Sequence, residues 1–241
     1  MDLGIAGKVA LVTAASKGLG RGTALSLAAE GVKVGICARG ESALRETEAQ
    51  IRDEGGEVLA LVADVTEPSE PARLVEAVTT HFGGLDILVA NAGGPRPERA
   101  MELSDEEILA AVNANLVTSV RLVRAAVPWM RRAGWGRICL ITSIAVKEPI
   151  PTLALSNLSR TGLWAWAKTA AADLGPDGIT LNSACPGTHA TDRIKDLGSH
   201  AGPMGDPGDF GRVVTFLCSA PAGFISGTAV SVDGGVNRGL F

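Results

Sequence analysis

The sequence predicts an α/β fold in which one doubly wound, seven-stranded parallel sheet is flanked by helices. Short β-branched runs alternate with helical segments from one end of the chain to the other, and the connections between them are short and contain Gly. The 241 residues, 46% hydrophobic and 20% charged, are enough to bury one large core. With no repeat, linker or internal boundary, we expect a single domain over residues 1–241.

Seven short runs are predicted to be the strands of this sheet. Most are continuously apolar, which is typical of strands covered by helices on both faces. They are residues 9–13, 34–38, 58–62, 87–90, 138–142, 179–183 and 230–232.

Helical segments lie between the strands, over residues 21–30, 42–54, 71–82 and 105–132. Ser104 followed by Glu107 is a capping box and predicts the start of the last of these helices. In a doubly wound sheet, ligands bind beyond the carboxyl ends of the strands. The chemistry is therefore expected in segments 13–20, 38–41, 63–66, 90–94, 142–148 and 184–192.

Charge and composition argue against nucleic acid and anionic membranes as partners, and against a secreted or membrane-spanning protein. The formal net charge is −4, so we expect neither nucleic acid nor an anionic membrane as a partner. The first residues lack the pattern of a signal peptide, and no apolar run reaches the ~20 residues of a membrane span. We therefore expect a cytoplasmic protein. The four scattered cysteines, Cys37, Cys139, Cys185 and Cys218, are predicted to be buried thiols, with no metal site.

The segment Thr13-Ala-Ala-Ser-Lys-Gly-Leu-Gly20 lies between the first strand and the first helix. Glycines allow the backbone to approach a diphosphate closely, and the helix N-terminus offers unpaired N–H groups and a positive dipole end. Because this turn connects a strand at the chain start to a helix, it predicts a dinucleotide site of the Rossmann type.

Over essentially its whole length the sequence resembles the short-chain dehydrogenase/reductase family. The family has Gly where Ala14 stands, so the first turn departs slightly from the family pattern. Four further motifs match in order and spacing: Ala90-Asn-Ala-Gly93, Asn115-Leu116, Pro186-Gly-Thr-His-Ala-Thr191 and Val232-Asp-Gly-Gly235.

The charge after the second strand predicts which cofactor binds. An acidic residue there would bind the ribose hydroxyls of NAD, whereas an Arg accommodates the additional phosphate of NADP. Arg39 stands nineteen residues after Gly20, and Lys17 adds a second cation, so we expect NADP(H) rather than NAD(H). The resemblance implies that Asp64 and Val65 flank the adenine and that Thr191 contacts the nicotinamide. The full cofactor set is Thr13, Ser16, Lys17, Gly18, Leu19, Gly20, Arg39, Asp64, Val65, Asn91, Ala92, Gly93, Arg160, Pro186, Gly187 and Thr191.

The resemblance also implies a catalytic Asn, a Ser and a Tyr-x-x-x-Lys pair. Asn115 and Ser143 match the first two, but Ser156 and Arg160 stand where the Tyr and Lys belong. The chain contains no tyrosine, so no other alignment restores the motif. The pattern resembles a divergent branch of the family with S-N-x-x-R at this place. The predicted catalytic set is Asn115, Ser143, Ser156 and Arg160.

Without the tyrosine, the source of the proton stays open. The candidates are Ser156 polarised by Arg160, Lys147 in the loop four residues past Ser143, His189 in the loop after Pro186-Gly187, and water. Arg160 cannot relay a proton itself, since a guanidinium stays protonated. His81 and His200 are weaker candidates.

The predicted function is NADP(H)-dependent oxidation or reduction of a carbonyl/hydroxyl substrate, similar to a 3-oxoacyl reductase. The alternatives are a non-redox isomerase, cyclase or dehydratase, and a catalytically silent dinucleotide-binding subunit. The loop 191–207 is short and contains Gly, which favours an open pocket for a bulky or carrier-tethered substrate. The alternative is that the loop is merely shortened and has no relation to the substrate. The resemblance implies a homodimer or homotetramer, with the Trp-bearing segment 163–172 partly at an interface.

Overall fold

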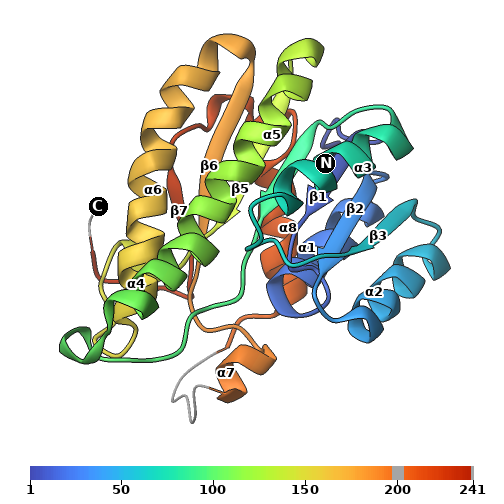
Figure 1. Cartoon of the computed structure of the whole chain (residues 1–241). Helices are drawn as coiled ribbons and strands as arrows, with labels where there is room; N and C mark the ends of the chain where they lie inside the picture. The colour runs from blue at the N-terminus through green and yellow to red at the C-terminus, as the bar shows by residue number, and fades with distance from the viewer. Residues whose placement is uncertain (197–203, 240–241) are drawn as a thin grey trace.

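The computed structural model describes residues 1–196 and 204–239 and contains one seven-stranded sheet (Figure 1). The strand order is β3-β2-β1-β4-β5-β6-β7, and every neighbouring pair is parallel. The order reverses between β1 and β4, so the crevice expected to bind a ligand opens there. The predicted fold class is confirmed.

The strands fall where the apolar runs predict them: β3 and β4 match the predicted ranges, and the other strands shift by one to three residues at an end. Strand β5 begins two residues early, at Gly136, and includes the buried Arg137, and β6 continues three residues further, through the buried Ala184 and Cys185 to Pro186. The strands are β1 Val9–Val12, β2 Lys33–Ala38, β3 Val58–Val62, β4 Ile87–Ala90, β5 Gly136–Ile141, β6 Ile179–Pro186 and β7 Ala229–Val232.

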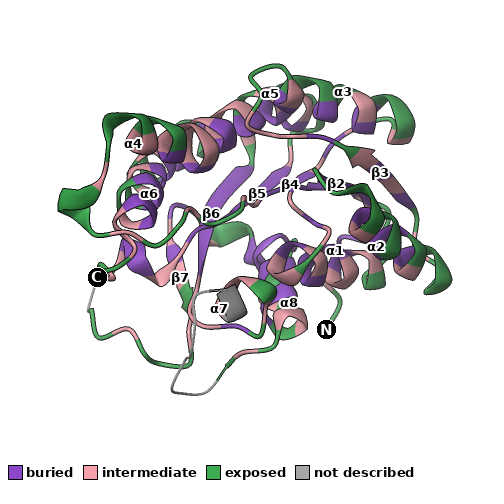
Figure 2. Ribbon diagram, turned by 60° about the horizontal axis from the view of Figure 1, so that its bottom comes forward, coloured by how far each residue is buried: buried purple, intermediate pink, exposed green. Residues whose placement is uncertain are grey.

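Helices cover both faces of the sheet (Figure 2). One core packs α1, α2 and α8 against one face through side chains such as Leu27, Leu44 and Phe210, and a second core packs α3, α5 and α6 against the other. The helices are α1 Gly18–Ala29, α2 Glu41–Asp53, α3 Glu70–Phe82, α4 Asp105–Val112, α5 Thr118–Ala133, α6 Ala154–Leu174, α7 Asp192–Asp196 and α8 Pro207–Leu217.

Glycines allow α8 to pack unusually close to α1. A Cβ on Gly22 would lie 2.2 Å from Pro207 O, and one on Gly211 would lie 2.3 Å from Gly22 O. Asp206 caps α8 by accepting from the amides of Gly208 and Asp209, and Pro207 stands at the first turn. This contact places α8 directly behind the helix that begins at the glycine turn.

The helix predicted over 105–132 begins at the predicted capping box but is not uniform. Glu107 N donates to Ser104 Oγ over 3.3 Å, and Ser104 N donates to Glu107 Oε2 over 3.0 Å. Between α4 and α5 the chain forms a π-helical turn, Asn113–Val117. There Thr118 Oγ1 donates to Asn113 O over 2.8 Å, a bond between residues five apart. Turns of this kind occur frequently at functional sites, and this one contains Asn115.

The helical run Asp105–Ala133 is long and apolar enough to cross a membrane by length and composition alone. A single such helix is weak evidence, because core helices of soluble proteins pass the same test, and α5 packs against α3, β4 and β5. All four cysteines are buried and free, as predicted. Burial raises the pKa of the Cys37 thiol to about 12.

Candidate active site

The turn after β1 is hydrogen-bonded to the loop after β4. Thr13 Oγ1 donates to Asn91 O over 2.7 Å and accepts from Asn91 N over 2.9 Å. Asn91 Nδ2 donates to Ala14 O over 3.2 Å. These bonds join the two walls of the crevice at the point where the strand order reverses. Thr13 and Asn91 therefore shape the site from beneath its surface.

The glycine turn is tight, and its one departure from the family pattern is visible in the backbone. A Cβ on Gly20 would lie 2.3 Å from Ala14 O, so only glycine fits there without movement. Ala14 has φ 48°, and within the described part of the chain it is the one non-glycine residue with positive φ. The position thus has the left-handed conformation that glycine adopts without strain.

Helix α1 begins at Gly18, and none of the described side chains caps its N-terminus. The side chain of Lys17 does not cap the helix, and its first turn contains no acidic residue. The first N–H groups and the positive dipole end are consequently left for a ligand. The predicted residues Gly18, Leu19 and Gly20 supply this part of the site.

Two exposed cations stand at the carboxyl ends of β1 and β2. Lys17 Nζ lies 3.5 Å from Asp192 Oδ2, and Arg39 Nη1 lies 3.8 Å from Asp64 Oδ2. The side chains of Lys17 and Arg39 are 66% and 78% exposed, so these pairs are weak and open to exchange with a phosphate. Hydrogen bonds from Thr66 N and Oγ1, with the charge of Arg39, lower the pKa of Asp64.

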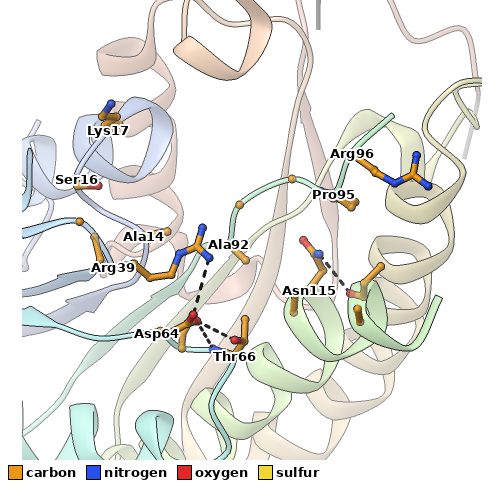
Figure 3. A pocket seen from close by; sticks show the side chains of 18 of the residues that line it. Ala14, Ser16, Lys17, Arg39, Asp64, Thr66, Ala92, Pro95, Arg96 and Asn115 are labelled. Carbon is orange, nitrogen blue, oxygen red and sulfur yellow. Dashed lines mark hydrogen bonds and ion pairs between the residues drawn. The ribbon is translucent and has the colours of Figure 1, made fainter. Parts of the chain in front are cut away.

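A cleft of 660 Å³ runs along this edge of the sheet (Figure 3). It extends from the ends of β1, β2 and β3 across the loop after β4 to α4, the π-helical turn and the start of α6. The predicted residues that line it are Ser16, Lys17, Arg39, Asp64, Val65, Ala92, Gly93 and Asn115. Those that do not line it are Thr13, Gly18, Leu19, Gly20, Asn91, Ser143, Ser156, Arg160, Pro186, Gly187 and Thr191.

Several lining residues were missed by the sequence analysis. Thr66 lies within the predicted segment 63–66 but was not named as a site residue, and Pro95 and Arg96 directly follow the predicted segment 90–94, so extending that segment by two residues would have found them. Ala110 and Ala114 come from helical positions that carry no distinguishing pattern. They become part of the site only because α4 and the π-helical turn cross the edge of the sheet.

The loop after β6 reaches the glycine turn from the opposite side. A Cβ on Gly18 would lie 3.1 Å from Thr191 Cγ2. Gly187 N donates to Val232 O over 3.0 Å, and a Cβ on Gly187 would lie 2.7 Å from Asp233 Cβ. The motifs at Pro186 and Asp233, far apart in sequence, are thereby fixed beside the start of α1.

Asn115 is buried in the π-helical turn with half of its amide unsatisfied. Its Nδ2 donates to Ala111 O over 3.3 Å, whereas its Oδ1 has no partner among the described residues. A buried acceptor without a partner is costly and marks a place for a water or a ligand donor. Since Asn115 also lines the cleft, this orphaned oxygen fits a bound ligand.

Ser143 and Ser156 lie on neighbouring elements. Ser143 lies two residues after the end of β5, and its Oγ accepts from Ala145 N over 3.1 Å, which leaves the hydroxyl hydrogen free to donate. Ser156 is in the first turn of α6 and is only 7% exposed. The neighbouring Leu155 lines the cleft, so the start of α6 borders it as predicted for this position.

Arg160 is buried and bound to the backbone at the switch point. Its Nη1 donates to Ile141 O over 2.7 Å, and its Nη2 donates to Ala92 O over 3.3 Å. The guanidinium thus fastens the carboxyl end of β5 to the loop after β4. Burial, together with the charge of Arg193, lowers the pKa of Arg160 to about 10, so the group remains a cation at neutral pH.

The other proton-donor candidates are less well placed. His189 is 5% exposed; its ring packs edge-on against Phe210, 5.1 Å between centroids, and against Gly205. Lys147 follows the turn Ile144–Val146 and does not line the cleft. His81 is at the exposed end of α3 beside Phe82. His200 and the middle of the loop 191–207 lie outside the described residues.

A family model for short chain dehydrogenases matches residues 8–202, most of the chain. The chain belongs to the short-chain dehydrogenase family. As predicted, it is therefore an oxidoreductase, and it has the Rossmann-type fold of this family. A 3-oxoacyl-[acyl-carrier-protein] reductase of Vibrio cholerae is 32% identical over 97% of this chain and 99% of the relative. The human dehydrogenase/reductase SDR family member 4 is 32% identical over 96% of this chain and 88% of its own length.

Solved structures of short-chain dehydrogenases superimpose on nearly the whole chain. L-sorbose reductase of Gluconobacter frateurii, complexed with NADPH and L-sorbose, is 33% identical with a TM-score of 0.93, covering 100% of both chains. A 7α-hydroxysteroid dehydrogenase complexed with NADH is 28% identical with a TM-score of 0.93, covering 97% of this chain and 96% of the other. Solved members of the family are thus complexed with NADPH in one case and with NADH in the other.

Proposed function

We propose that the chain is an NADP(H)-dependent reductase or dehydrogenase that acts on a carbonyl/hydroxyl substrate, similar to a 3-oxoacyl reductase. We further propose that residues 1–241 form one catalytic domain and that the protein is cytoplasmic. The observation that supports it best is the pair of exposed cations, Lys17 and Arg39, at the ends of β1 and β2. Residues 37–40 contain no Asp or Glu, whereas NAD-binding chains place a carboxylate at this point to bind the ribose hydroxyls.

The residues present fit the dinucleotide at each part of the cleft. The N-terminus of α1 with Gly18, Leu19 and Gly20 would bind the diphosphate, and Ser16, Lys17 and Arg39 the phosphate on the adenosine ribose. Asp64 and Val65 would border the adenine. On the other side, Ala92, Gly93, Pro186, Gly187 and Thr191 would border the nicotinamide half, with Thr13 and Asn91 supporting the turn and Arg160 beneath the loop.

When bound, the dinucleotide supplies the hydride that a carbonyl carbon accepts, and the carbonyl oxygen takes up a proton. The Ser143 hydroxyl, whose lone pair already accepts from Ala145 N, donates its hydrogen toward that oxygen. Asn115 orders the adjoining helix turn and offers its free Oδ1 to a water. Ser156, four residues before Arg160 on α6, passes a proton from water, because a serine is too weak an acid to replace a phenol alone.

A second candidate is a binding or non-redox role for the same pocket. The absence of any tyrosine favours it, since a positioned general acid contributes about 10²–10⁴ in rate. The bonds of Arg160 to two backbone carbonyls also favour it, because they give the residue a structural role independent of hydride transfer.

Turnover distinguishes the two candidates. NADPH is mixed with the full-length chain and a panel of aldehydes, ketones and 3-oxo esters, and the nicotinamide absorbance is followed. The redox function predicts a substrate-dependent loss of absorbance. Ser143→Ala should lower kcat by about 10²–10³ while the Kd for NADPH stays within about twofold, because one oxyanion donor is lost. Tight NADPH binding without oxidation by any carbonyl compound would reject the redox function.

We also propose a homodimer or homotetramer. The Trp-bearing part of α6 supports it, since Trp164 and Trp166 are only half-buried within the chain. Light scattering of the purified chain at micromolar concentration should give a mass above 24.7 kDa by an integral factor of two or four.

A further inference from the structure

Two arginines from distant parts of the chain rest against the same short loop after β4. Arg160 of α6 donates to Ala92 O over 3.3 Å, and Arg193 of α7 donates to Pro95 O. A Cβ on Gly94 would lie 3.0 Å from Arg193 Nε, so the guanidinium covers this glycine. The loop from Ala92 to Pro95 lines the cleft on the side away from Arg39 (Figure 3), and the two guanidinium groups, which are not among the lining residues, contact this loop.

These two guanidinium groups differ from the other cations of the cleft in having no acidic partner. Lys17 and Arg39 each face an aspartate, and Arg96 is ion-paired with Glu98 and Glu107. In the part of the chain that the structure describes, no carboxylate lies within 4.0 Å of Arg160 or Arg193. Among the described residues, the hydrogen bonds of these two groups all go to backbone carbonyls.

Like charges held together away from water attract an anion strongly. Arg160 is 6% exposed and Arg193 is half-buried, and the two charges are close enough to act on one another. The field of two cations in a region of low dielectric is strong, and an oxyanion between them lowers the cost of their burial. A guanidinium matches a carboxylate in geometry because its N–H groups bind both oxygens at once.

We propose that Arg193, with the charge of Arg160 behind it, binds a carboxylate group of the substrate, so that the enzyme acts on free oxo acids or hydroxy acids. The proposal rests on the proposed function and narrows its substrate class away from neutral ketones and carrier-bound thioesters. The carboxylate stays unchanged in the reaction; it orients the neighbouring carbonyl toward Ser143. Arg193 is then a specificity residue that touches the substrate.

A diphosphate has the same oxyanion chemistry as a carboxylate and is the other source to consider. The diphosphate already has a binding place at the N-terminus of α1, where Thr191 adjoins Gly18. Arg193 instead lies against Gly94 and Pro95, beyond the predicted cofactor residues Ala92 and Gly93. This position favours the substrate as the source.

Matched substrates and variants test the proposal on the full-length chain. With saturating NADPH, 3-oxobutanoate and its ethyl ester are compared in the unaltered protein, Arg193→Gln and Arg212→Gln. Arg212 is an exposed arginine of α8 paired with Asp209, so its variant removes the same charge at a remote place. Arg193→Gln should raise KM for the acid by about 10–100-fold, the value of one charge-assisted contact, and leave that for the ester within about twofold.

Three outcomes would overturn the proposal. An equal KM increase for acid and ester would make Arg193 a residue of general structural importance. A Kd for NADPH raised about tenfold in Arg193→Gln would assign the oxyanion to the cofactor diphosphate. A KM change of the same size in Arg212→Gln would indicate a long-range charge effect.

Binding without turnover separates failure of this proposal from failure of the proposed function. The melting temperature of the NADPH-loaded protein is measured with and without 3-oxobutanoate, since a ligand bound to the native state raises it. If no carbonyl compound is reduced, the proposed function fails, yet a shift present in the unaltered chain and lost in Arg193→Gln supports the anion site. The same shift in both proteins, or none in the unaltered chain, contradicts it.

Discussion

The two ends of the cleft hold their positive charges in opposite ways. At the end proposed for the adenosine, Lys17 and Arg39 are exposed and lie 3.5 and 3.8 Å from aspartate oxygens. Behind the end proposed for the substrate, Arg160 is buried and donates to two backbone carbonyls. Exposed ion pairs contribute ~0–1 kcal/mol and exchange partners readily, whereas a buried cation is part of the packing. The first arrangement suits capture of a phosphate, and the second suits a fixed frame for chemistry.

The largest expected effect follows from this difference. Arg160→Met should lower the free energy of unfolding by about 2–4 kcal/mol, because Ile141 O and Ala92 O lose their donors in a buried place. Arg39→Met, the matched change at the exposed end, should change it by less than about 0.5 kcal/mol. Urea unfolding followed by Trp fluorescence measures both. Equal losses in the two variants would remove the contrast between the two ends.

A smaller effect of opposite sign is expected in the glycine turn. Ala14→Gly should raise the free energy of unfolding by about 0.5–1 kcal/mol, because Ala14 has φ 48° and glycine adopts this conformation without strain. Ala15→Gly, in the same turn but without positive φ, should destabilise by a similar amount and serves as the control. A destabilised Ala14→Gly variant would show that the alanine methyl group contributes more by contact than it costs in strain.

The smallest expected effect concerns acid stability at the adenosine end. Hydrogen bonds from Thr66 and the charge of Arg39 lower the folded-state pKa of Asp64. A lowered carboxyl pKa contributes stability above the unfolded value, and this contribution is lost as the pH falls through the folded value. Asp64→Asn should therefore be less stable at neutral pH, by under about 1 kcal/mol, and the difference should disappear as the pH falls below the folded-state pKa of Asp64. A difference independent of pH would assign the loss to altered hydrogen bonding alone.

The sequence predicted the sheet, and the convergence of the segments after β1, β2 and β3 on one cleft, because both depend on local patterns. Apolar runs mark each strand, and parallel strands bring their carboxyl ends to one edge, so Ser16, Arg39 and Asp64 had to converge there. Helix α8 was not predicted, since Pro207, Gly208 and Gly211 are typical of a loop and become helical only through the cap at Asp206 and close packing on α1.

The substrate end was less predictable because its contacts join distant segments. Nothing local to Arg160 indicates that its guanidinium binds the ends of β4 and β5. His189 follows a strand, as a catalytic residue would, but packs onto Phe210 from α8, a helix absent from the prediction. Arg193 has no motif of its own and gains its place only when α7 meets the loop at Pro95.

The preference between the two dinucleotides tests the central claim most directly. The Kd values of NADPH and NADH are measured by quenching of Trp fluorescence in the unaltered chain and in the double variant Lys17→Gln with Arg39→Gln. The structure predicts NADPH binding about 10–100-fold tighter than NADH in the unaltered chain, and a ratio near one in the variant, because two charge-assisted contacts to the phosphate are lost. Equal or tighter binding of NADH to the unaltered chain, or an unchanged ratio in the variant, would contradict it.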